Sequence, residues 1–380
     1  MLNEEQLKHL KSIRNQLHAH PEVSEHEFET QKIILDFLKK ETKASVKSVT
    51  NTGVLAIYMG NQPGPTVMIR GDIDALPIQE VNTFDYASTA EGVSHKCGHD
   101  GHTTILLGLS ILFSEQPIKK GKLILLFQPA EENGKGAQAV LNDAEFKKER
   151  IDYAFALHNL PGYPTNEIVV KEQEFTGNVK SIILKMTGKT AHAAEPEKGF
   201  NPSMAISEIF VYANSITFNK PEEKDFFLMT PVYSTLGDNS SYGISAGYGE
   251  VHFTIRSWSV DIMKQRSEEI VAFMEETCKN HHLTPDISWT EVFHANVNHP
   301  EAVNFIIKAS KENKFNLTER EYPFPWGEDF GLFTQNFKGA MFGLGSGVST
   351  PALHNPDYDF PDEITATGIQ MFNSIINQIL

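Results

Sequence analysis

Cysteine is scarce in this chain, and its scarcity limits the kinds of protein that the chain can be. Only Cys97 and Cys278 occur among the 380 residues, far apart and in unlike sequence contexts. Small secreted domains that depend on disulfides use many more cysteines, so a disulfide framework is excluded and a reducing compartment is expected. The first residues contain no apolar segment typical of a secretory signal, and we therefore predict a cytoplasmic protein.

Long apolar runs and runs of basic residues are also missing. No stretch approaches the roughly 18 uninterrupted apolar residues of a membrane-spanning helix, so a transmembrane protein is not expected. The chain carries 33 Lys and Arg against 49 Asp and Glu, a formal net charge of −16. Phosphate surfaces are bound by clustered positive charge, so neither nucleic acid nor an anionic membrane is expected as a partner.

The hydrophobic pattern indicates two domains, as the length of the chain allows. Short apolar strands alternate with amphipathic helices at both ends of the chain, which is typical of an α/β domain whose mainly parallel sheet is covered by helices. Between them, residues 180–187 and 249–256 alternate polar and apolar side chains, as half-exposed antiparallel strands do. We predict a discontinuous α/β domain of residues 1–175 and 289–380, with an α+β domain of residues 176–288 inserted into it.

One polar loop, residues 94–104, holds an unusual concentration of metal-binding side chains. Thiolate and imidazole are preferred ligands of zinc and similar ions. The alternative is a polar loop with a buried cysteine and surface histidines, and the choice depends on the partners that the remaining chain offers. His95 is expected to be solvent-exposed in either case. The side chains in question are His95, Cys97, His99, Asp100 and His102.

Further potential ligands stand where four predicted strands end or nearly end, and sites in α/β sheets form beyond such strand ends. Together with Cys97 and His99 they suffice for two cations that share a ligand. One carboxylate of a Glu pair could bind metal, while the other takes a proton from a metal-bound water and passes it to a leaving amine. Two aspartates on one loop could each orient a ligating imidazole. These strand-end residues are Asp72 and Asp74, Glu131 and Glu132, His158, and His354.

Seven short motifs follow one another from the N-terminus to the C-terminus. They are His-x-His-Pro-Glu at 18–22, Arg-Gly-Asp-Ile-Asp-Ala-Leu-Pro at 70–77, Cys-Gly-His-Asp-Gly-His-Thr at 97–103, Gln-Pro-Ala-Glu-Glu at 128–132, Thr-Ala-His-Ala-Ala-x-Pro at 190–196, Gly-Glu-Asp-Phe at 327–330, and Leu-His-Asn-Pro-x-Tyr-Asp-Phe at 353–360. In this order they resemble the M20 family of metallopeptidases, and specifically its amidohydrolase branch of N-acyl-amino-acid deacylases, N-acetyldiaminopimelate deacetylases, auxin-conjugate hydrolases and hippurate hydrolases. Residues 239–246 depart from the family's usual Asn-Val-Ile-Pro-like segment.

The resemblance implies a metal centre with two divalent ions. Cys97 would bridge the ions, Glu131 would be the general base and acid, and Asp74 would be the catalytic aspartate behind a ligand. Mixed nitrogen, oxygen and sulfur ligands are compatible with zinc, manganese, nickel or cobalt. The remaining metal ligands would be His99, Glu132, His158 and His354.

Other residues receive supporting or substrate-binding roles. Asp72, Asp100 and His102 are expected to support the ligands by hydrogen bonds rather than to bind metal. The inserted domain would be the family's lid and dimerisation domain, in a protein that is a homodimer or a monomer. In that domain, His192 would reach the substrate carbonyl oxygen or carboxylate, and Arg256 is a candidate for binding the substrate carboxylate.

We therefore predict a metal-dependent amidohydrolase that cleaves the amide bond of an N-acyl amino acid by a metal-bound hydroxide. Its partners would be small N-acyl amino acids or short peptides. A dipeptidase or aminopeptidase of the same family is the alternative among hydrolases. A non-catalytic metal-binding protein of this fold would be expected to lack a ligand or the base, and a hydrolase with Cys97 as nucleophile would leave the Glu pair unexplained.

Overall fold

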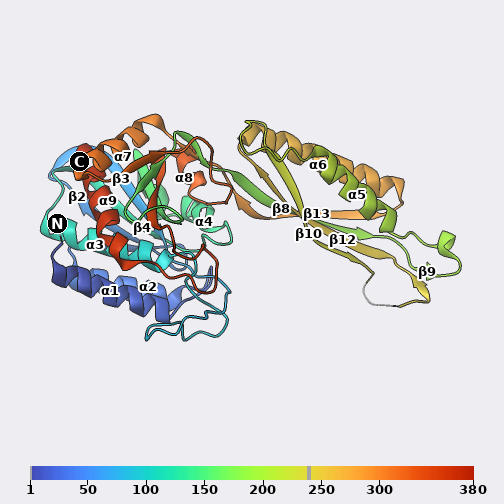
Figure 1. Cartoon of the computed structure of the whole chain (residues 1–380), viewed down its shortest axis with the longest axis horizontal. Coiled ribbons are helices and arrows are strands. Elements are labelled where there is room, and N and C mark those ends of the chain that lie inside the picture. Colours follow the sequence, from blue (N-terminus) through green and yellow to red (C-terminus); the bar gives the residue numbers. More distant parts are fainter. Residues whose placement is uncertain (1, 238–240) are drawn as a thin grey trace. The chain divides into compact units, whose positions relative to one another are not determined.

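The computed structural model describes residues 2–237 and 241–380, which form two compact units (Figure 1). The larger unit comprises residues 1–175, 296–321 and 328–380, and the smaller unit comprises residues 176–295 and 322–327. The second boundary of the smaller unit lies seven residues beyond the position expected from the sequence, because strand β13 (Thr284–Phe293) runs through residue 288. Asn239 and Ser240, in the segment that departs from the family pattern, lie outside the described residues.

An eight-stranded sheet forms the centre of the larger unit, in the order β1-β2-β4-β3-β5-β16-β6-β15. The central strands β4, β3, β5 and β16 are parallel, as are β6 and β15, whereas β1–β2, β2–β4 and β6–β16 are antiparallel pairs. The central strands are almost entirely buried, as expected of a mainly parallel sheet covered by helices. The prediction of this fold class is confirmed. The strands are β1 (Ser45–Val49), β2 (Gly53–Met59), β3 (Gln62–Asp72), β4 (Lys120–Gln128), β5 (Tyr153–Pro161), β6 (Ile168–Val170), β15 (Leu317–Glu319) and β16 (Lys338–Gly347).

Helix α3 (His99–Glu115) is the most deeply buried helix of this unit, with every residue from His99 to Ser114 buried. It is apolar all round because it packs against β3 on one side and against α1, α2 and α9 on others. It begins earlier than the predicted loop allowed, so His99, Asp100 and His102 belong to its first turn. The other helices of the larger unit are α1 (Glu4–Ala19), α2 (Phe28–Glu41), α4 (Gly136–Asn142), α7 (Pro300–Asn313), α8 (Gly331–Asn336) and α9 (Thr365–Ile379), with 3-10 turns η1 (Phe146–Lys148) and η3 (Asp362–Ile364). A separate two-stranded pair is formed by β7 (Gln173–Thr176) and β14 (Asn296–Asn298).

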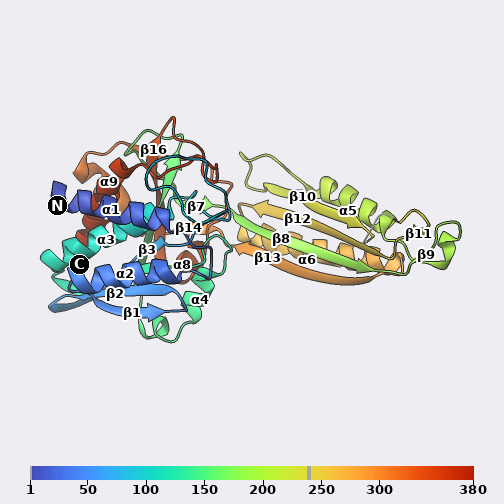
Figure 2. The same cartoon turned by 90° about the horizontal axis from the view of Figure 1, so that it is seen from below.

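The smaller unit is built on an antiparallel sheet in the order β10-β12-β8-β13. Its two helices cover one face of the sheet (Figure 2), where alternate apolar side chains of the strands are buried against them. This agrees with the alternation predicted from the sequence. Within the described part of the chain, no helix is both long enough and apolar enough to cross a bilayer. The elements are β8 (Asn178–Thr187), β9 (Ala191–His192), η2 (Pro196–Lys198), α5 (Ser203–Ile216), β10 (Phe227–Leu236), β11 (Ile244–Ser245), β12 (Tyr248–Ser257), α6 (Val260–Asn280) and β13 (Thr284–Phe293).

A buried network of charges connects α1 to the first turn of α3. Arg14 and His18, both inaccessible to solvent, contact Asp100 Oδ2 at 3.1 and 2.8 Å. The other nitrogen of His18, Nε2, lies 3.0 Å from Glu80 Oε1. Burial opposes a charge on this imidazole, but the hydrogen bonds to Asp100 and Glu80 raise the pKa of His18 to about 9. His18 is therefore an imidazolium at neutral pH.

We expect His18 to make the larger unit less stable at alkaline pH. Its pKa is higher in the folded chain than in the unfolded chain, so its contribution is complete below pH about 6.5 and is lost as the pH rises through about 9, a loss of about 3 kcal/mol in the free energy of unfolding. Urea unfolding at pH 6 and pH 10 measures this loss in the wild type, in His18→Gln and in a control, His26→Gln, at an exposed histidine. A His18→Gln protein with the same pH dependence as the wild type would contradict the assignment.

Candidate metal centre

The predicted ligands converge beyond the carboxyl ends of the parallel strands, as the strand-end argument anticipates. Glu132 follows β4, and His158 lies in β5 three residues before this strand ends. Cys97 and His99 stand at the N-terminus of α3, and His354 lies in the loop after β16. Five side chains from four distant parts of the chain are thus brought together.

The five side chains form two groups of three that have Cys97 in common. Cys97, His99 and His158 form one group, and Cys97, Glu132 and His354 form the other; within each group the candidate ligand atoms all lie within 4.8 Å of one another. Cys97 Sγ lies 3.6 Å from His158 Nε2, and His354 Nε2 lies 3.7 Å from Glu132 Oε2. Donor atoms at these separations are compatible with cations between them, and the thiol common to both groups would be the ligand shared by two such cations.

The histidines present the ring nitrogen that a metal ion requires. His99 Nδ1 lies 2.9 Å from the Asp74 carbonyl oxygen, and His158 Nδ1 lies 2.9 Å from the Asn159 carbonyl oxygen. Each Nδ1–H therefore donates to a backbone oxygen, which directs Nε2 into the centre. Within the described structure, His99 Nε2 and Glu132 Oε1 are buried without a hydrogen-bond partner, although they lie 3.7 Å apart. A divalent cation at each of the two groups would satisfy one of these atoms, and the donor set fits such cations.

Buried acidic groups make the centre strongly attractive to positive charge. Burial, with the nearby Glu132 and Glu131 carboxylates, raises the pKa of the Cys97 thiol well above its usual range. Burial, with Asp74 and Asp72, raises the pKa of Glu132 to about 8. These shifts reflect like charges forced together in a dry site, and bound cations reverse them.

The predicted supporting residues contact ligands, one another or residues outside the ligand set. Both nitrogens of His102 are engaged, Nδ1 with Asp72 Oδ1 at 2.5 Å and Nε2 with Asn159 Oδ1 at 2.6 Å. Asp100 faces His18 and Arg14, as described above. Asp74 lies directly behind His99, and its Oδ2 accepts the Glu132 N–H at 3.0 Å. This arrangement is compatible with support by hydrogen bonding.

Two carboxylates beside Glu131 have no assigned role in the sequence analysis. Glu328 and Asp329 are buried, and one oxygen of each lies close to an oxygen of Glu131. Burial, together with Glu328, Glu132 and Asp329, raises the pKa of Glu131 well above its usual range. Arg70 compensates these charges, since its guanidinium lies 2.9 Å from Glu328 and 2.8 Å from Asp329. The sequence contained one indication of these two carboxylates, the position of Arg70 inside an otherwise apolar strand. A buried guanidinium requires carboxylate partners.

His95 differs from expectation. Its side chain is 2% exposed rather than solvated, and among the described residues neither ring nitrogen has a hydrogen-bond partner. Burial lowers the pKa of His95 to about 4, so the ring is neutral. The polar surroundings of this stretch in the sequence concealed its burial, because it packs beneath segments that are remote in the chain.

The two predicted substrate-binding residues lie in the smaller unit. His192, at the end of β9, is exposed and accepts the Ala194 N–H at Nδ1, 3.0 Å away. In the neutral ring the proton is then on Nε2, which makes that atom a donor suited to a carbonyl or carboxylate oxygen. Arg256, on β12, donates from Nη1 to the Pro325 carbonyl oxygen at 2.6 Å.

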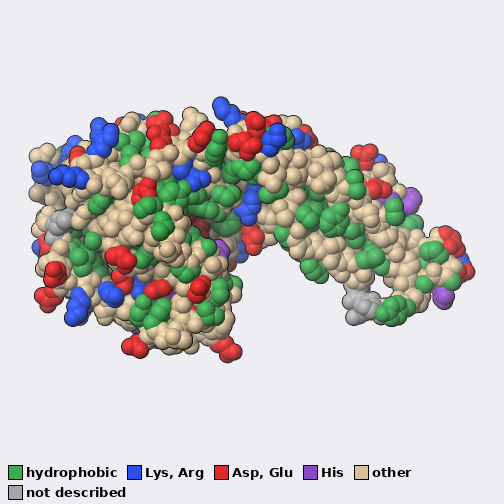
Figure 3. Space-filling view, in the orientation of Figure 1, with side chains coloured by type: hydrophobic (Ala, Val, Ile, Leu, Met, Phe, Trp, Pro, Cys, Tyr) green, Lys and Arg blue, Asp and Glu red, His purple; other side chains and the backbone are tan. Residues whose placement is uncertain are grey.

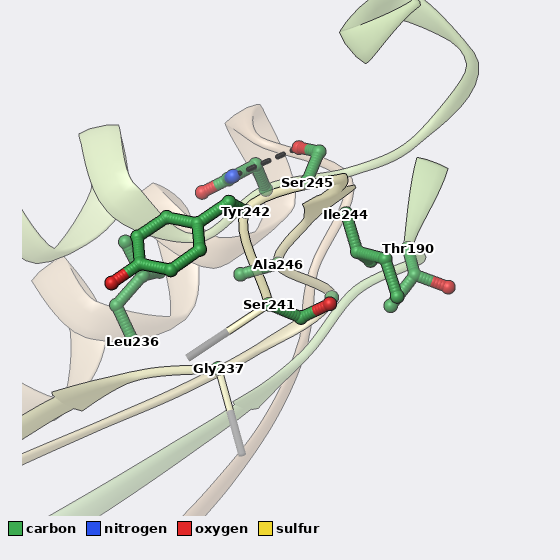
Figure 4. A pocket seen from close by; sticks show the side chains of 10 residues that line it. Thr190, Leu236, Gly237, Ser241, Tyr242, Ile244, Ser245 and Ala246 are labelled. Carbon is green, nitrogen blue, oxygen red and sulfur yellow. Dashed lines mark hydrogen bonds between the residues drawn. The ribbon is translucent and has the colours of Figure 1, made fainter. Parts of the chain in front are cut away.

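A pocket of about 620 Å³ lies next to the β9–β11 pair (Figure 4). Its ten described lining residues carry no charge, and they include Tyr242, Ile244 and Leu236. Asn201 Nδ2 donates to Ser245 Oγ at 3.0 Å across one side. Its described lining residues therefore offer no cationic partner for a carboxylate, and His192 and Arg256 are not among them.

The mainly parallel α/β unit, the inserted antiparallel unit and the paired donor groups at the strand ends define the class of metallohydrolases. A family model described as peptidase family M20/M25/M40 matches residues 68–378. The chain belongs to this family. It is accordingly a hydrolase that acts on amide bonds.

Individual relatives agree with this assignment over most of their length. The chain is 32% identical over 339 residues to an N-acetyl-L-cysteine deacetylase of Bacillus subtilis, covering 88% of this chain and 80% of the relative. It is 31% identical over 367 residues to an N-acetyldiaminopimelate deacetylase of Geobacillus sp., covering 96% of each chain. Among solved structures, the Bacillus subtilis YXEP protein, a dinuclear metal-binding peptidase from the M20 family, matches with a TM-score of 0.83 at 26% identity, covering 99% of each chain.

Proposed function

We propose that the protein hydrolyses the amide bond of an N-acyl amino acid with the help of two divalent metal ions. The observation that carries the proposal is the pair of three-donor groups joined by Cys97, with the carboxyl of Glu131 beside them. Cys97, His99 and His158 would hold one ion, and Cys97, Glu132 and His354 the other. When bound, the ions (zinc, manganese, nickel or cobalt) would polarise the amide carbonyl and make a water molecule nucleophilic at neutral pH.

Glu131 would carry the proton through the reaction. Its Oε1 accepts the Asp329 N–H at 3.3 Å, which holds the carboxyl in place and leaves Oε2 for proton transfer. Oε2 takes a proton from the attacking water and delivers it to the amide nitrogen. One C–O bond forms and the C–N bond breaks, so that a carboxylic acid and an amino acid with a free amine are released. Asp74 fixes the orientation of His99 during these steps.

The relatives and the donors of the smaller unit support the proposed substrate class. Two relatives act, by their names, on N-acetylated amino acids, which supports an N-acyl amino acid here. The Nε2–H of His192 would bind the substrate carbonyl or carboxylate oxygen, and Arg256 would bind the carboxylate. Unpaired Cys97 and Cys278 support the prediction of a cytoplasmic enzyme.

The smaller unit would join two copies of the chain into a dimer. Strand β10 is an edge of its sheet, and hydrophobic side chains gather on the face of this unit seen in Figure 3. Val232 and Tyr233 on β10 and Val211 on α5 are more than half exposed. An exposed edge strand with apolar neighbours is a template for pairing with a second chain.

We expect Val211→Glu to convert a dimer into a monomer. A charge placed in an apolar contact that recurs by symmetry is introduced twice, so its desolvation opposes association. Size-exclusion chromatography with light scattering measures the mass of the particle. Val348→Glu is the matched control, because Val348 is equally exposed (68% against 70%) but belongs to the larger unit. A wild type with the mass of one chain would show that the dimer is wrong.

The proposed activity is tested by amine release from N-acetyl amino acids, N-benzoyl amino acids and dipeptides. Each substrate is assayed after chelator treatment, with and without added Zn²⁺ or Mn²⁺. We expect hydrolysis of N-acyl amino acids that stops on metal removal and returns on metal addition. Hydrolysis of dipeptides alone would replace the proposed substrate class by peptides, and activity that chelators leave intact would remove the metals from the mechanism.

A further inference from the structure

His354 is the least firmly anchored of the candidate ligands. His99 and His158 lie within α3 and β5, and Cys97 and Glu132 lie within four residues of α3 and β4. His354 instead stands seven residues beyond β16, its side chain is 52% exposed, and its backbone has the left-handed φ of 66° that is uncommon outside glycine. Its position must therefore be fixed by contacts of the loop that carries it.

Lys96 makes those contacts at two points. Its carbonyl oxygen accepts the His354 N–H at 2.7 Å, and its Nζ donates to the Tyr358 carbonyl oxygen at 2.8 Å. The residue next to Cys97 thus holds the loop at His354 itself and again four residues later. Tyr358 is also held at its other end, since its hydroxyl oxygen accepts from Asn159 Nδ2 at 2.5 Å.

The side chain of Lys96 is completely buried, which is exceptional for a lysine. Its ammonium forms an ion pair with Glu80 Oε1, and Glu80 in turn accepts the Ser88 N–H at 2.6 Å and contacts His18. Burying an ammonium is unfavourable unless it is paired and hydrogen-bonded. An apolar side chain at this position would avoid that cost, but it could not bind the Tyr358 carbonyl.

We propose that Lys96 is a positioning residue that holds His354 in place to complete the Cys97–Glu132–His354 group. The inference rests on the proposed two-metal function and extends it to a residue outside the ligand set. The side chain of Lys96 holds this loop through the Tyr358 carbonyl, whereas its contact with the His354 N–H is made by the backbone. Removing the ammonium therefore loosens the loop of His354 and weakens one ion, and it spares the ion of the Cys97–His99–His158 group. A purely structural ion pair would instead weaken both groups together through loss of stability.

The test is a calorimetric titration of chelator-stripped, full-length protein with Zn²⁺. We expect two ions in the wild type. In Lys96→Met one ion binds with wild-type affinity, and the other binds about 10- to 100-fold more weakly, as is common when an outer contact of a metal ligand is lost. High Zn²⁺ concentrations then restore hydrolysis by Lys96→Met. Lys122→Met is the matched control, because it removes an ion pair with Glu149 elsewhere in the larger unit and both ions should bind as in the wild type.

A second variant separates positioning from folding. Lys96→Met leaves Glu80 without its lysine partner, although the ion pair with His18 remains, whereas Glu80→Gln with Lys96→Met removes both charges of the Lys96–Glu80 pair at similar volume. The selective loss of one ion should persist in this double variant. Two ions bound with wild-type affinity in either variant, or equal weakening of both ions, would overturn the role of Lys96. A wild type that binds fewer than two zinc ions would overturn the two-metal centre itself.

Discussion

Glu131→Gln is expected to lower turnover of N-acyl amino acids by about 10²- to 10⁴-fold, the contribution typical of a general acid–base group. Glutamine has nearly the same shape and can still accept the Asp329 N–H, but it cannot take a proton from water. Metal binding should persist, because the donors of both ions are elsewhere. Steady-state kinetics and metal content by mass spectrometry check the two halves of this expectation.

The neighbouring residue supplies the contrast. Glu132→Gln removes a carboxylate from the Cys97–Glu132–His354 group, so this variant should lose both turnover and one ion. The metal contents of these two variants therefore show which of Glu131 and Glu132 is the ligand. Turnover that persists in Glu131→Gln would show that Glu131 is not the base, and loss of metal in that variant would make it a ligand.

Cys97→Ala is expected to have the largest effect on metal binding, because Cys97 belongs to both donor groups. Changes in outer contacts of a ligand already cost about 10- to 100-fold, so loss of a shared ligand should weaken both ions by at least about 100-fold, and turnover should fall in proportion. Zinc titration measures the affinities. Cys278→Ala removes the other buried cysteine, in α6 of the smaller unit, and should leave them unchanged.

The same variant distinguishes the thiolate ligand from a thiolate nucleophile. If Cys97 attacked the substrate directly, the wild type would remain active after chelation, and Cys97→Ala would be inactive at any metal concentration. If Cys97 is a ligand, chelation abolishes the hydrolytic activity of the wild type, and excess metal restores part of the activity of Cys97→Ala. Zinc affinities in Cys97→Ala equal to those of the wild type would remove Cys97 from the centre.

The fold class and the convergence of the ligands could be predicted because they depend on local patterns. Apolar strands run directly into Asp72, Glu131 and His158, and the parallel sheet brings those strand ends to one edge. Alternation along residues 180–187 and 249–256 likewise reveals a sheet with one covered face. These features depend on the periodicity of polar and apolar side chains, which can be read directly from the sequence.

Other features depend on contacts between distant segments, and the sequence around each residue does not indicate them. His95 appears solvated in the sequence, but it lies beneath segments from elsewhere in the chain. Residues 322–327 join the smaller unit although 26 residues of the larger unit separate them from its main part, and a segment of six residues is too short to show a periodic pattern. Glu328 and Asp329 acquire significance only beside Arg70, which is more than 250 positions away.

The order of the ligands along the chain has a consequence for biosynthesis. Cys97, His99 and His158 are all present once residue 158 has been translated, whereas His354 arrives almost 200 residues later. Strand β16, which precedes His354, must also take its place between β5 and β6 after the smaller unit has been made. A nascent chain would thus bring together the proposed donors of one ion as soon as residue 158 has folded into place. The second proposed group would be complete only after His354 has been made, which is after the whole inserted part of the smaller unit, so the two ions would be bound at different stages of synthesis.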